Sequence, residues 1–157
     1  DILVNEYTHF FGEHDFKNDV KIKIIGEKKG LPYNIRNILS NIENQTKENT
    51  KLNLNIAFNY GTNKELLSII NNIINIHKNN KVIINDTMLR EHMYLSNIPD
   101  PDLLIRTGGF QRLSNFLLLK LSYTELFFTK TLWPNFNKKE LFEIFEKYRN
   151  IERNYGL

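Results

Sequence analysis

The residues best able to do chemistry gather in one short segment between two apolar runs: Arg106, Gly108, Gly109, Arg112 and Ser114. Two guanidinium groups and a hydroxyl suit the oxygens of a phosphate or diphosphate, and glycine lets the backbone approach a bound group closely. The apolar pattern of residues 113–123 predicts a helix, whose first N–H groups would add donors for an anion. The segment therefore predicts a loop that binds a polyanion.

The same segment also has a purely structural interpretation. Arg106 would then pair with a nearby acid such as Asp102, Ser114 would only cap the helix, and the glycines would only turn the chain. Residue types alone leave both interpretations open.

A second polar cluster, Asn59-Tyr60-Gly61, follows another strand-like run. Ligands of open parallel sheets bind beyond the carboxyl ends of the strands, and both clusters are expected at such ends. The cluster therefore stands where a ligand of such a sheet would bind. The alternative is that Asn59 only completes a turn.

The elements that must position these clusters alternate along the chain. β-Branched or alternating runs predict strands at residues 20–26, 52–61, 103–107 and 125–129. Helical spacing predicts helices at residues 31–49, 63–78, 87–93, 113–123 and 142–148, with Asp86 as the cap of the third. In the second helix the apolar stripe is Leu66, Ile70, Ile73 and Ile74. This alternation predicts an α/β fold, a parallel sheet flanked by helices.

Composition limits the classes of protein to which the chain can belong. Its 157 residues, 41% of them hydrophobic, suffice for one core, so a single domain is expected. The net charge of +3 comes from interleaved basic and acidic residues, so no nucleic-acid partner is expected. The chain has no cysteine for thiolate chemistry, and its four histidines show no metal-ligand spacing. No run reaches the roughly 18 apolar residues of a membrane span, so we expect a soluble chain or one that lies on a membrane.

The order of residues carries a family resemblance. "DLLIRTGGFQRLSNFLL" followed by "SYTELFFTKTLWPNF" resembles the carboxy-terminal signature of the cis-prenyltransferases, the undecaprenyl diphosphate synthase family. The likeness extends through "VKIKIIGE", "LNLNIAFNYG", "MLREHMYLSNIPDPD" and "RNIERNYG", and so covers essentially the whole chain.

The resemblance implies an enzyme that adds isopentenyl diphosphate to an allylic diphosphate, usually farnesyl diphosphate, to make a long undecaprenyl-type polyprenyl diphosphate. By motif position, Arg106, Arg112 and Ser114 would hold the isopentenyl diphosphate, with Gly108 and Gly109 in the same loop. Glu125 matches a catalytic carboxylate that helps to hold Mg²⁺, and Asn59 matches an active-site position. Arg153 and Gly156 match a tail that approaches the site in the dimer.

The resemblance also implies assembly and location. Family members form homodimers through the region that corresponds to residues 125–136. A lipid product makes peripheral membrane contact plausible, and the implied location is the cytoplasm or an organelle stroma.

Two departures from the family pattern stand out. Phe110 and Gln111 occupy positions where many relatives have a glutamate and often a histidine. The Asp-Gly-Asn motif that carries the family's main magnesium ligand is missing, so residues 1–157 are expected to be one domain that lacks the family's N-terminal third and is inactive alone. The alternatives are a non-catalytic partner subunit and a diphosphate-binding module of the same fold. An absent strand would also leave an exposed apolar edge or face that favours association.

Overall fold

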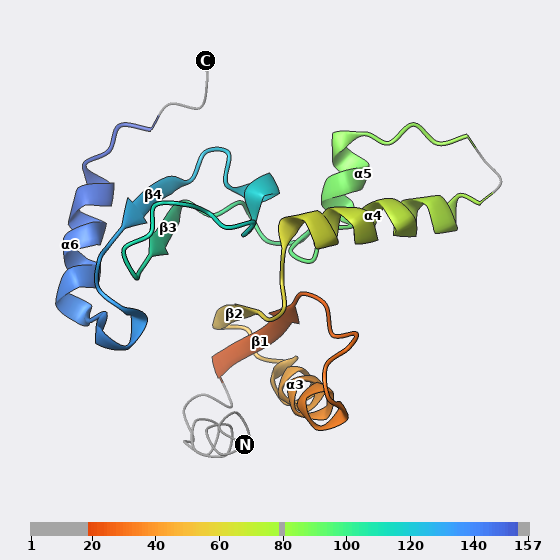
Figure 1. Ribbon diagram of the computed structural model, residues 1–157, viewed down its shortest axis with the longest axis horizontal. Helices are drawn as coiled ribbons and strands as arrows, with labels where there is room; N and C mark the ends of the chain where they lie inside the picture. Colours follow the sequence, from red (N-terminus) through yellow and green to blue (C-terminus); the bar gives the residue numbers. More distant parts are fainter. Residues whose placement is uncertain (1–18, 79–80, 154–157) are drawn as a thin grey trace. The chain divides into compact units, whose positions relative to one another are not determined.

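The computed structural model describes residues 19–78 and 81–153, which Figure 1 draws as coloured ribbon. The chain divides into two compact units. The first unit ends at Leu95 and the second begins at Ser96. Gly156 lies outside the described residues. The expectation of a single domain stays a prediction.

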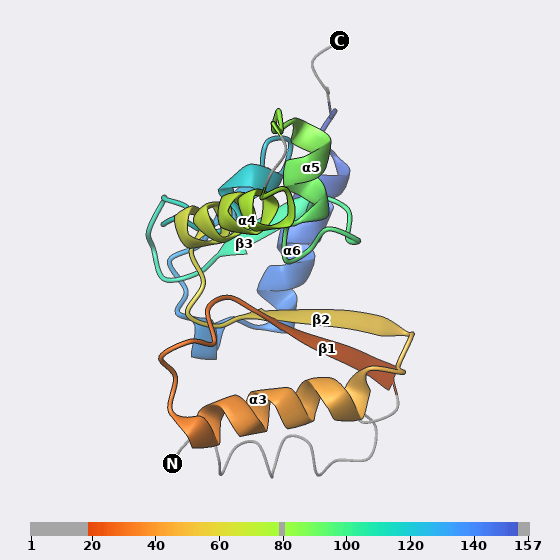
Figure 2. The ribbon, with the colours of Figure 1, turned by 90° about the vertical axis from the view of Figure 1, so that its right-hand side faces the viewer.

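The first unit is built on a strand–helix–strand segment. Strand β1 (Val20–Ile25) pairs in parallel with β2 (Leu52–Ala57), with Val20 opposite Leu52. Helix α3 (Tyr33–Thr46) connects them and runs along one face of the pair (Figure 2). The parallel pairing and the crossover helix confirm the predicted α/β class for this unit.

The core of the first unit lies between β1 and α3. Alternate residues of β1 face the helix, so Val20, Ile22 and Ile24 pack with Leu39 and Ile42. Polar side chains of α3 also accept hydrogen bonds from backbone N–H groups of β1. Thr46 Oγ1 accepts from the N–H of Ile22 at 3.1 Å, and Glu43 Oε1 accepts from that of Ile24 at 2.8 Å.

Two further helices lie among the described residues of the first unit: α4 (Thr62–Ile76) and α5 (Asp86–Glu91). The buried stripe of α4 consists of Thr62, Glu65, Ile69 and Ile73. It is rotated by one residue from the predicted stripe, because the buried Glu65 carboxylate interrupts the apolar pattern. The predicted cap of α5 is also wrong. Asn85 is the N-cap and accepts from Met88 N at 2.9 Å, whereas Asp86 lies in the first turn and pairs with Arg90.

The second unit holds another parallel pair, β3 (Leu103–Arg106) and β4 (Glu125–Phe128). Between them lies the 3₁₀ turn η1 (Leu118–Lys120), and after them come η2 (Trp133–Asn135) and helix α6 (Lys138–Arg149). The side chain of Asn137 caps α6 by accepting from Glu140 N at 3.1 Å. The four strands and the terminal helix confirm the sequence prediction within a few residues at each end.

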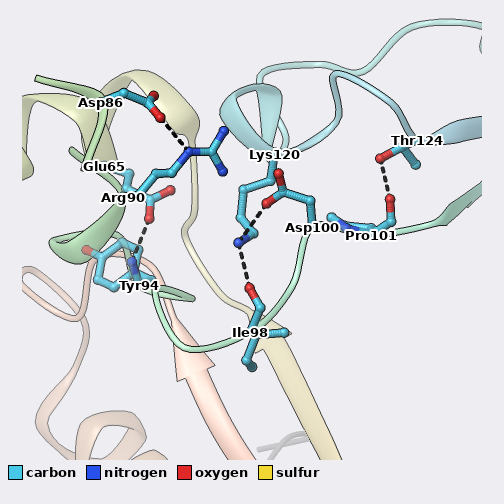
Figure 3. A network of polar contacts seen from close by, with 9 residues as sticks. All are labelled: Glu65, Asp86, Arg90, Tyr94, Ile98, Asp100, Pro101, Lys120 and Thr124. Carbon is cyan, nitrogen blue, oxygen red and sulfur yellow. Dashed lines mark hydrogen bonds and ion pairs between the residues drawn. The ribbon is translucent and has the colours of Figure 1, made fainter. Parts of the chain in front are cut away.

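The helix predicted at residues 113–123 is wrong. Only η1 is helical there, and Ser114, Asn115 and Leu117 have φ values of 50°, 63° and 48°. These left-handed conformations cannot continue a right-handed helix. Polar contacts of Lys120 connect this segment to the chain before β3. The Lys120 side chain is buried, with its Nζ 2.9 Å from Asp100 Oδ1 and 2.8 Å from the Ile98 carbonyl (Figure 3).

Large apolar side chains are exposed on both strand pairs. They include Leu52 and Ile56 on β2, Leu126 and Phe128 on β4, and the nearby Leu132 and Trp133. Exposed apolar surface was expected, and its role in association stays a prediction. Among the described helices, none is long and apolar enough to cross a membrane.

Candidate functional site

A pocket of about 340 Å³ opens at the carboxyl end of β3. It is lined by Leu104, Ile105, Arg106, Thr107, Arg112, Leu113, Ser114 and Phe116. Three of the predicted ligand-binding residues therefore line one pocket. They come from the end of a strand and from the loop that follows it, which is the place that parallel sheets use for ligands.

Arg106 and Ser114 are joined directly. Arg106 Nη1 donates to Ser114 Oγ at 3.0 Å, so the left-handed turn at Ser114 brings its hydroxyl back to the strand end. The predicted alternative partner of Arg106, Asp102, pairs instead with Arg153. Among the described side chains, no carboxylate forms an ion pair with Arg106 or Arg112.

An aromatic ring lies beside both arginines. The guanidinium carbon of Arg112 is 4.2 Å from the centroid of the Phe110 ring, and that of Arg106 is 5.8 Å away. Both distances lie within the range of cation–π attraction. The sequence analysis noted Phe110 only as a departure from the family. An aromatic residue four positions after one arginine and two before another is the signal that could have revealed this contact.

The two glycines shape the loop and pair with the chain that follows β4. Gly108 and Gly109 have φ values of 88° and 81°. Their N–H groups donate to the carbonyls of Thr131 and Thr129, each at 2.8 Å. The backbone donors of these glycines are thus engaged with the protein itself. Their direct contact with a ligand stays a prediction.

Glu125 lies away from the pocket that is lined by Arg106, Arg112 and Ser114, which we call the arginine pocket. It begins β4 opposite Leu103, whereas Arg106 lies opposite Phe128. The position of Glu125 and that of Arg106 are thus three residues apart along the strands, a distance of about 10 Å. Glu125 N donates to the Asp102 carbonyl at 3.0 Å, so both acids stand at the amino end of the pair.

Arg153 stands at that same end. Its Nη1 is 2.6 Å from Asp102 Oδ1, and its guanidinium also donates to Tyr148 Oη and the Tyr123 carbonyl. The structure thus separates the predicted polar and charged site residues of this unit into two groups. Arg106, Arg112 and Ser114 share the pocket, and Glu125 and Arg153 belong to the other end of the strands.

The described carboxylates do not make a magnesium site by themselves. Within residues 19–78 and 81–153, no three His, Asp or Glu side chains are grouped so that they could hold a metal ion. The acid nearest to Glu125 in the strand register, Asp102, is occupied by Arg153. Glu125 as a magnesium ligand stays a prediction, and no chemical step below depends on a metal.

Asn59, in the first unit, joins two strand ends. Its φ is 50°, and its side-chain Nδ2 donates to the carbonyl of Glu27 at 3.0 Å. In return, Glu27 N donates to the Asn59 carbonyl at 3.4 Å. These contacts favour the structural interpretation that Asn59 completes a turn. A catalytic role stays a prediction.

A buried carboxylate lies next to this turn. Glu65 accepts from Tyr60 Oη at 2.5 Å and from Tyr94 N at 2.8 Å (Figure 3 draws the second contact). Burial raises the pKa of the Tyr94 phenol above its usual value of 10.0, and the carboxylates of Glu65 and Glu27 raise the pKa further. The sequence analysis did not identify this cluster.

Comparison with known proteins identifies the family of the chain. The family model described as "Putative undecaprenyl diphosphate synthase" matches residues 2–156. An isoprenyl transferase of Thermotoga maritima is 41% identical over 138 residues, which are 87% of this chain and 59% of the relative. An isoprenyl transferase of Fusobacterium nucleatum is 40% identical over 140 residues, covering 89% of this chain and 59% of the relative. The chain thus spans less than two thirds of the length of these relatives.

Two solved structures share the fold. A crystal structure of a probable undecaprenyl diphosphate synthase from Campylobacter jejuni has a TM-score of 0.85 and 31% identity, covering 99% of this chain and 72% of the other. Lavandulyl diphosphate synthase from Lavandula x intermedia, solved in complex with dimethylallyl diphosphate, also has a TM-score of 0.85, with 28% identity over 100% of this chain and 67% of the other. From the match of residues 2–156 and these relatives, the chain belongs to the undecaprenyl diphosphate synthase family of prenyltransferases.

Proposed function

We propose that the arginine pocket of the second unit binds isopentenyl diphosphate for a cis-prenyl transfer. The observation that carries the proposal is the mixed lining of the pocket. Arg106, Arg112 and Ser114 offer donors for a diphosphate, and apolar side chains such as Leu113 and Phe116 lie beside them. A charged head joined to a short branched hydrocarbon suits both parts of this lining.

In the proposed reaction, isopentenyl diphosphate is the nucleophile and an allylic diphosphate, expected to be farnesyl diphosphate, is the electrophile. The isopentenyl double bond forms a new carbon–carbon bond to the allylic carbon. The bond from that carbon to oxygen breaks, and its electron pair leaves with the diphosphate. A proton lost from the isopentenyl unit restores a double bond, and repetition gives an undecaprenyl-type chain.

The residues of this chain act in that reaction by positioning. Arg106 and Arg112 would neutralise the diphosphate of the nucleophile, and Ser114 Oγ, which already accepts from Arg106, would contribute one more polar contact. Holding the head group in one place fixes the direction of the double bond, which raises the rate by orienting the reacting atoms. Mg²⁺ when bound would stabilise the departing diphosphate.

The segment 125–136 is proposed to mediate homodimer formation. Its apolar side chains Leu126, Phe128, Leu132 and Trp133 are exposed in the single chain. Burial of such a cluster in an interface removes apolar surface from water, which favours association. Sedimentation analysis of Trp133→Ser, whose side chain is 75% exposed, should show a larger monomer fraction than the unaltered chain.

The experiment that tests the proposed ligand is calorimetric titration of isopentenyl diphosphate into the intact chain and its variants. Arg112→Ala removes one charge-assisted contact, which is worth about 1.5 to 3 kcal/mol, so affinity should fall by about tenfold or more. The matched control is Arg149→Ala. Arg149 is an exposed arginine of the same unit, paired with Glu146 on α6, and its loss should leave the affinity unchanged.

The outcomes separate the candidate functions. Binding that depends on Arg112 but not on Arg149 supports the pocket as the isopentenyl diphosphate site. If such binding comes without product when farnesyl diphosphate and Mg²⁺ are added, the non-catalytic subunit or binding-module alternative is favoured. Equal affinity of Arg112→Ala and the unaltered chain would contradict the proposed function.

A further inference from the structure

The loop that lines the arginine pocket carries two cations and no anion. Between Arg106 and Ser114 the only charged side chains are Arg106 and Arg112. Both guanidinium groups lie near one ring, that of Phe110, at 5.8 Å and 4.2 Å from its centroid. Two like charges beside the same ring repel each other, so the free site is electrostatically unfavourable until an anion arrives.

The two arginines differ in what else holds them. Arg106 also donates to Ser114 Oγ at 3.0 Å and rises from strand β3. Arg112 lies on the loop beyond the glycines, and among the described residues its guanidinium contacts the Phe110 ring. Without the ring, the long Arg112 side chain would be free to sample several rotamers, and ordering it on binding would cost entropy.

We propose that Phe110 is a positioning residue that holds Arg106 and, above all, Arg112 in place for a ligand with two linked phosphates. The inference rests on the proposed function, because it concerns the same pocket. One guanidinium can satisfy a monophosphate, whereas a diphosphate spans both guanidinium groups and gains from their fixed spacing. The ring therefore favours diphosphate over monophosphate without contacting either ligand.

The binding test uses inorganic diphosphate and inorganic phosphate as probes, titrated calorimetrically into the intact chain. Phe110→Leu keeps an apolar side chain but removes the π system. It should weaken diphosphate binding by about two- to fivefold, the usual strength of an exposed cation–π contact, and should weaken monophosphate binding less. Phe110→Tyr keeps the ring and should restore the diphosphate affinity. Phe145→Leu, on α6, makes the same change outside the pocket and should leave both affinities unchanged.

A double-mutant cycle identifies the arginine through which Phe110 acts. If the ring works by holding Arg112, Phe110→Leu should have little further effect in an Arg112→Ala background. In an Arg106→Ala background the effect of Phe110→Leu should persist. Full additivity of Phe110→Leu with Arg112→Ala would overturn the positioning role.

A second measurement separates this inference from the proposed function. In the free chain, the ring current of Phe110 should shift the side-chain Nε–H resonance of Arg112 upfield, and Phe110→Leu should abolish the shift. An unshifted Arg112 resonance overturns the inference even if diphosphate binds. A shifted resonance in a chain that binds no diphosphate contradicts the proposed function. It also contradicts the inferred role of Phe110, because the arginines that the ring holds would then have no diphosphate to bind. Equal diphosphate affinity of Phe110→Leu and the unaltered chain, with Arg112→Ala still impaired, overturns the inference alone.

Discussion

Arg153 Nη1 lies 2.6 Å from Asp102 Oδ1, an ion pair that joins the segment after α6 to the residue just before β3. The pair stands at the amino end of β3, whereas the arginine pocket opens at its carboxyl end. The tail arginine of one chain is therefore engaged away from the pocket of the same unit. A role of Arg153 at a pocket stays a prediction, and this ion pair would compete with that role.

Loss of the ion pair should loosen residues 151–153 with little cost in global stability. Asp102→Asn should speed amide hydrogen exchange at residues 151–153. The unfolding free energy should fall by only about 0.5 kcal/mol, because the Asp102 side chain is mostly exposed. Glu146→Gln, which breaks the exposed pair with Arg149 on α6, is the matched control. Equal exchange rates in the two variants would show that Asp102 does not tether the tail.

Gly26 should tolerate a side chain poorly. Its φ is 116°, and a Cβ would lie 2.1 Å from the backbone carbonyl oxygen of Phe58. Gly26→Ala must therefore push apart the turns that end β1 and β2, and we expect a loss of more than about 2 kcal/mol in urea unfolding.

Gly30 supplies the control for that substitution. Its φ is 85°, but among the described residues no atom beyond its two chain neighbours lies within 4 Å of the position of a Cβ. Gly30→Ala should cost only the strain of a left-handed residue, about 1 kcal/mol. Equal losses for the two variants would mean that strain alone, and not the close approach of Phe58, determines the effect.

The strands and most helices could be predicted because their apolar residues repeat with the period of the element. The β1 sequence alternates, and its alternate residues Val20, Ile22 and Ile24 are buried as that pattern predicts. The stripe of α4 was displaced by one residue because Glu65, a carboxylate that pattern analysis assigns to solvent, is buried by its bonds to Tyr60 and Tyr94. Periodicity does not reveal that a carboxylate is buried by a hydrogen bond from a residue as far along the chain as Tyr94.

The pocket was predictable in its residue types but not in its conformation. Arg106, Arg112 and Ser114 were correctly expected to lie together, since all three follow one strand within a short loop. The apolar run after Ser114 suggested a helix, yet Ser114, Asn115 and Leu117 take positive φ. Apolar spacing does not report the sign of φ in non-glycine residues. The contacts of the Phe110 ring with the two arginines were missed. Comparison with the family pattern recorded Phe110 only as the absence of the usual residue, and not as an aromatic side chain with contacts of its own.

The buried Glu65 should be important for the stability of the first unit. Glu65→Ala would leave the Tyr94 N–H and the Tyr60 hydroxyl without their acceptor, at an expected cost of about 3 kcal/mol. Glu65→Gln keeps one carbonyl acceptor and should cost about 1 kcal/mol. Chemical denaturation of both variants tests the order, and a Glu65→Gln variant as unstable as Glu65→Ala would show that the charge, not the hydrogen bonds, matters.

The raised pKa of Tyr94 predicts a loss of stability at alkaline pH. The folded state keeps the phenol protonated more strongly than the unfolded state, whose pKa is 10.0. The contribution of Tyr94 is therefore fully present below pH 10.0 and is lost as pH rises through the higher pKa of the folded state. Tyr94→Phe should lose less stability over this range than the unaltered chain. In Glu65→Gln, tyrosinate absorbance should show a lower pKa for Tyr94, still above 10.0, because burial is the larger cause.

Lys120 and Asp100 should respond unequally to neutral substitutions. The Lys120 side chain is 5% exposed and that of Asp100 is 41% exposed, so the ammonium is the more strongly desolvated partner. Asp100→Asn leaves that buried charge with weaker compensation, whereas Lys120→Met replaces it with an apolar chain of similar length and leaves an acid that water can reach. We expect Asp100→Asn to cost about 2 kcal/mol in urea unfolding and Lys120→Met to cost less. The reverse order would mean that the contact from Lys120 to the Ile98 carbonyl, rather than the ion pair, anchors the segment before β4.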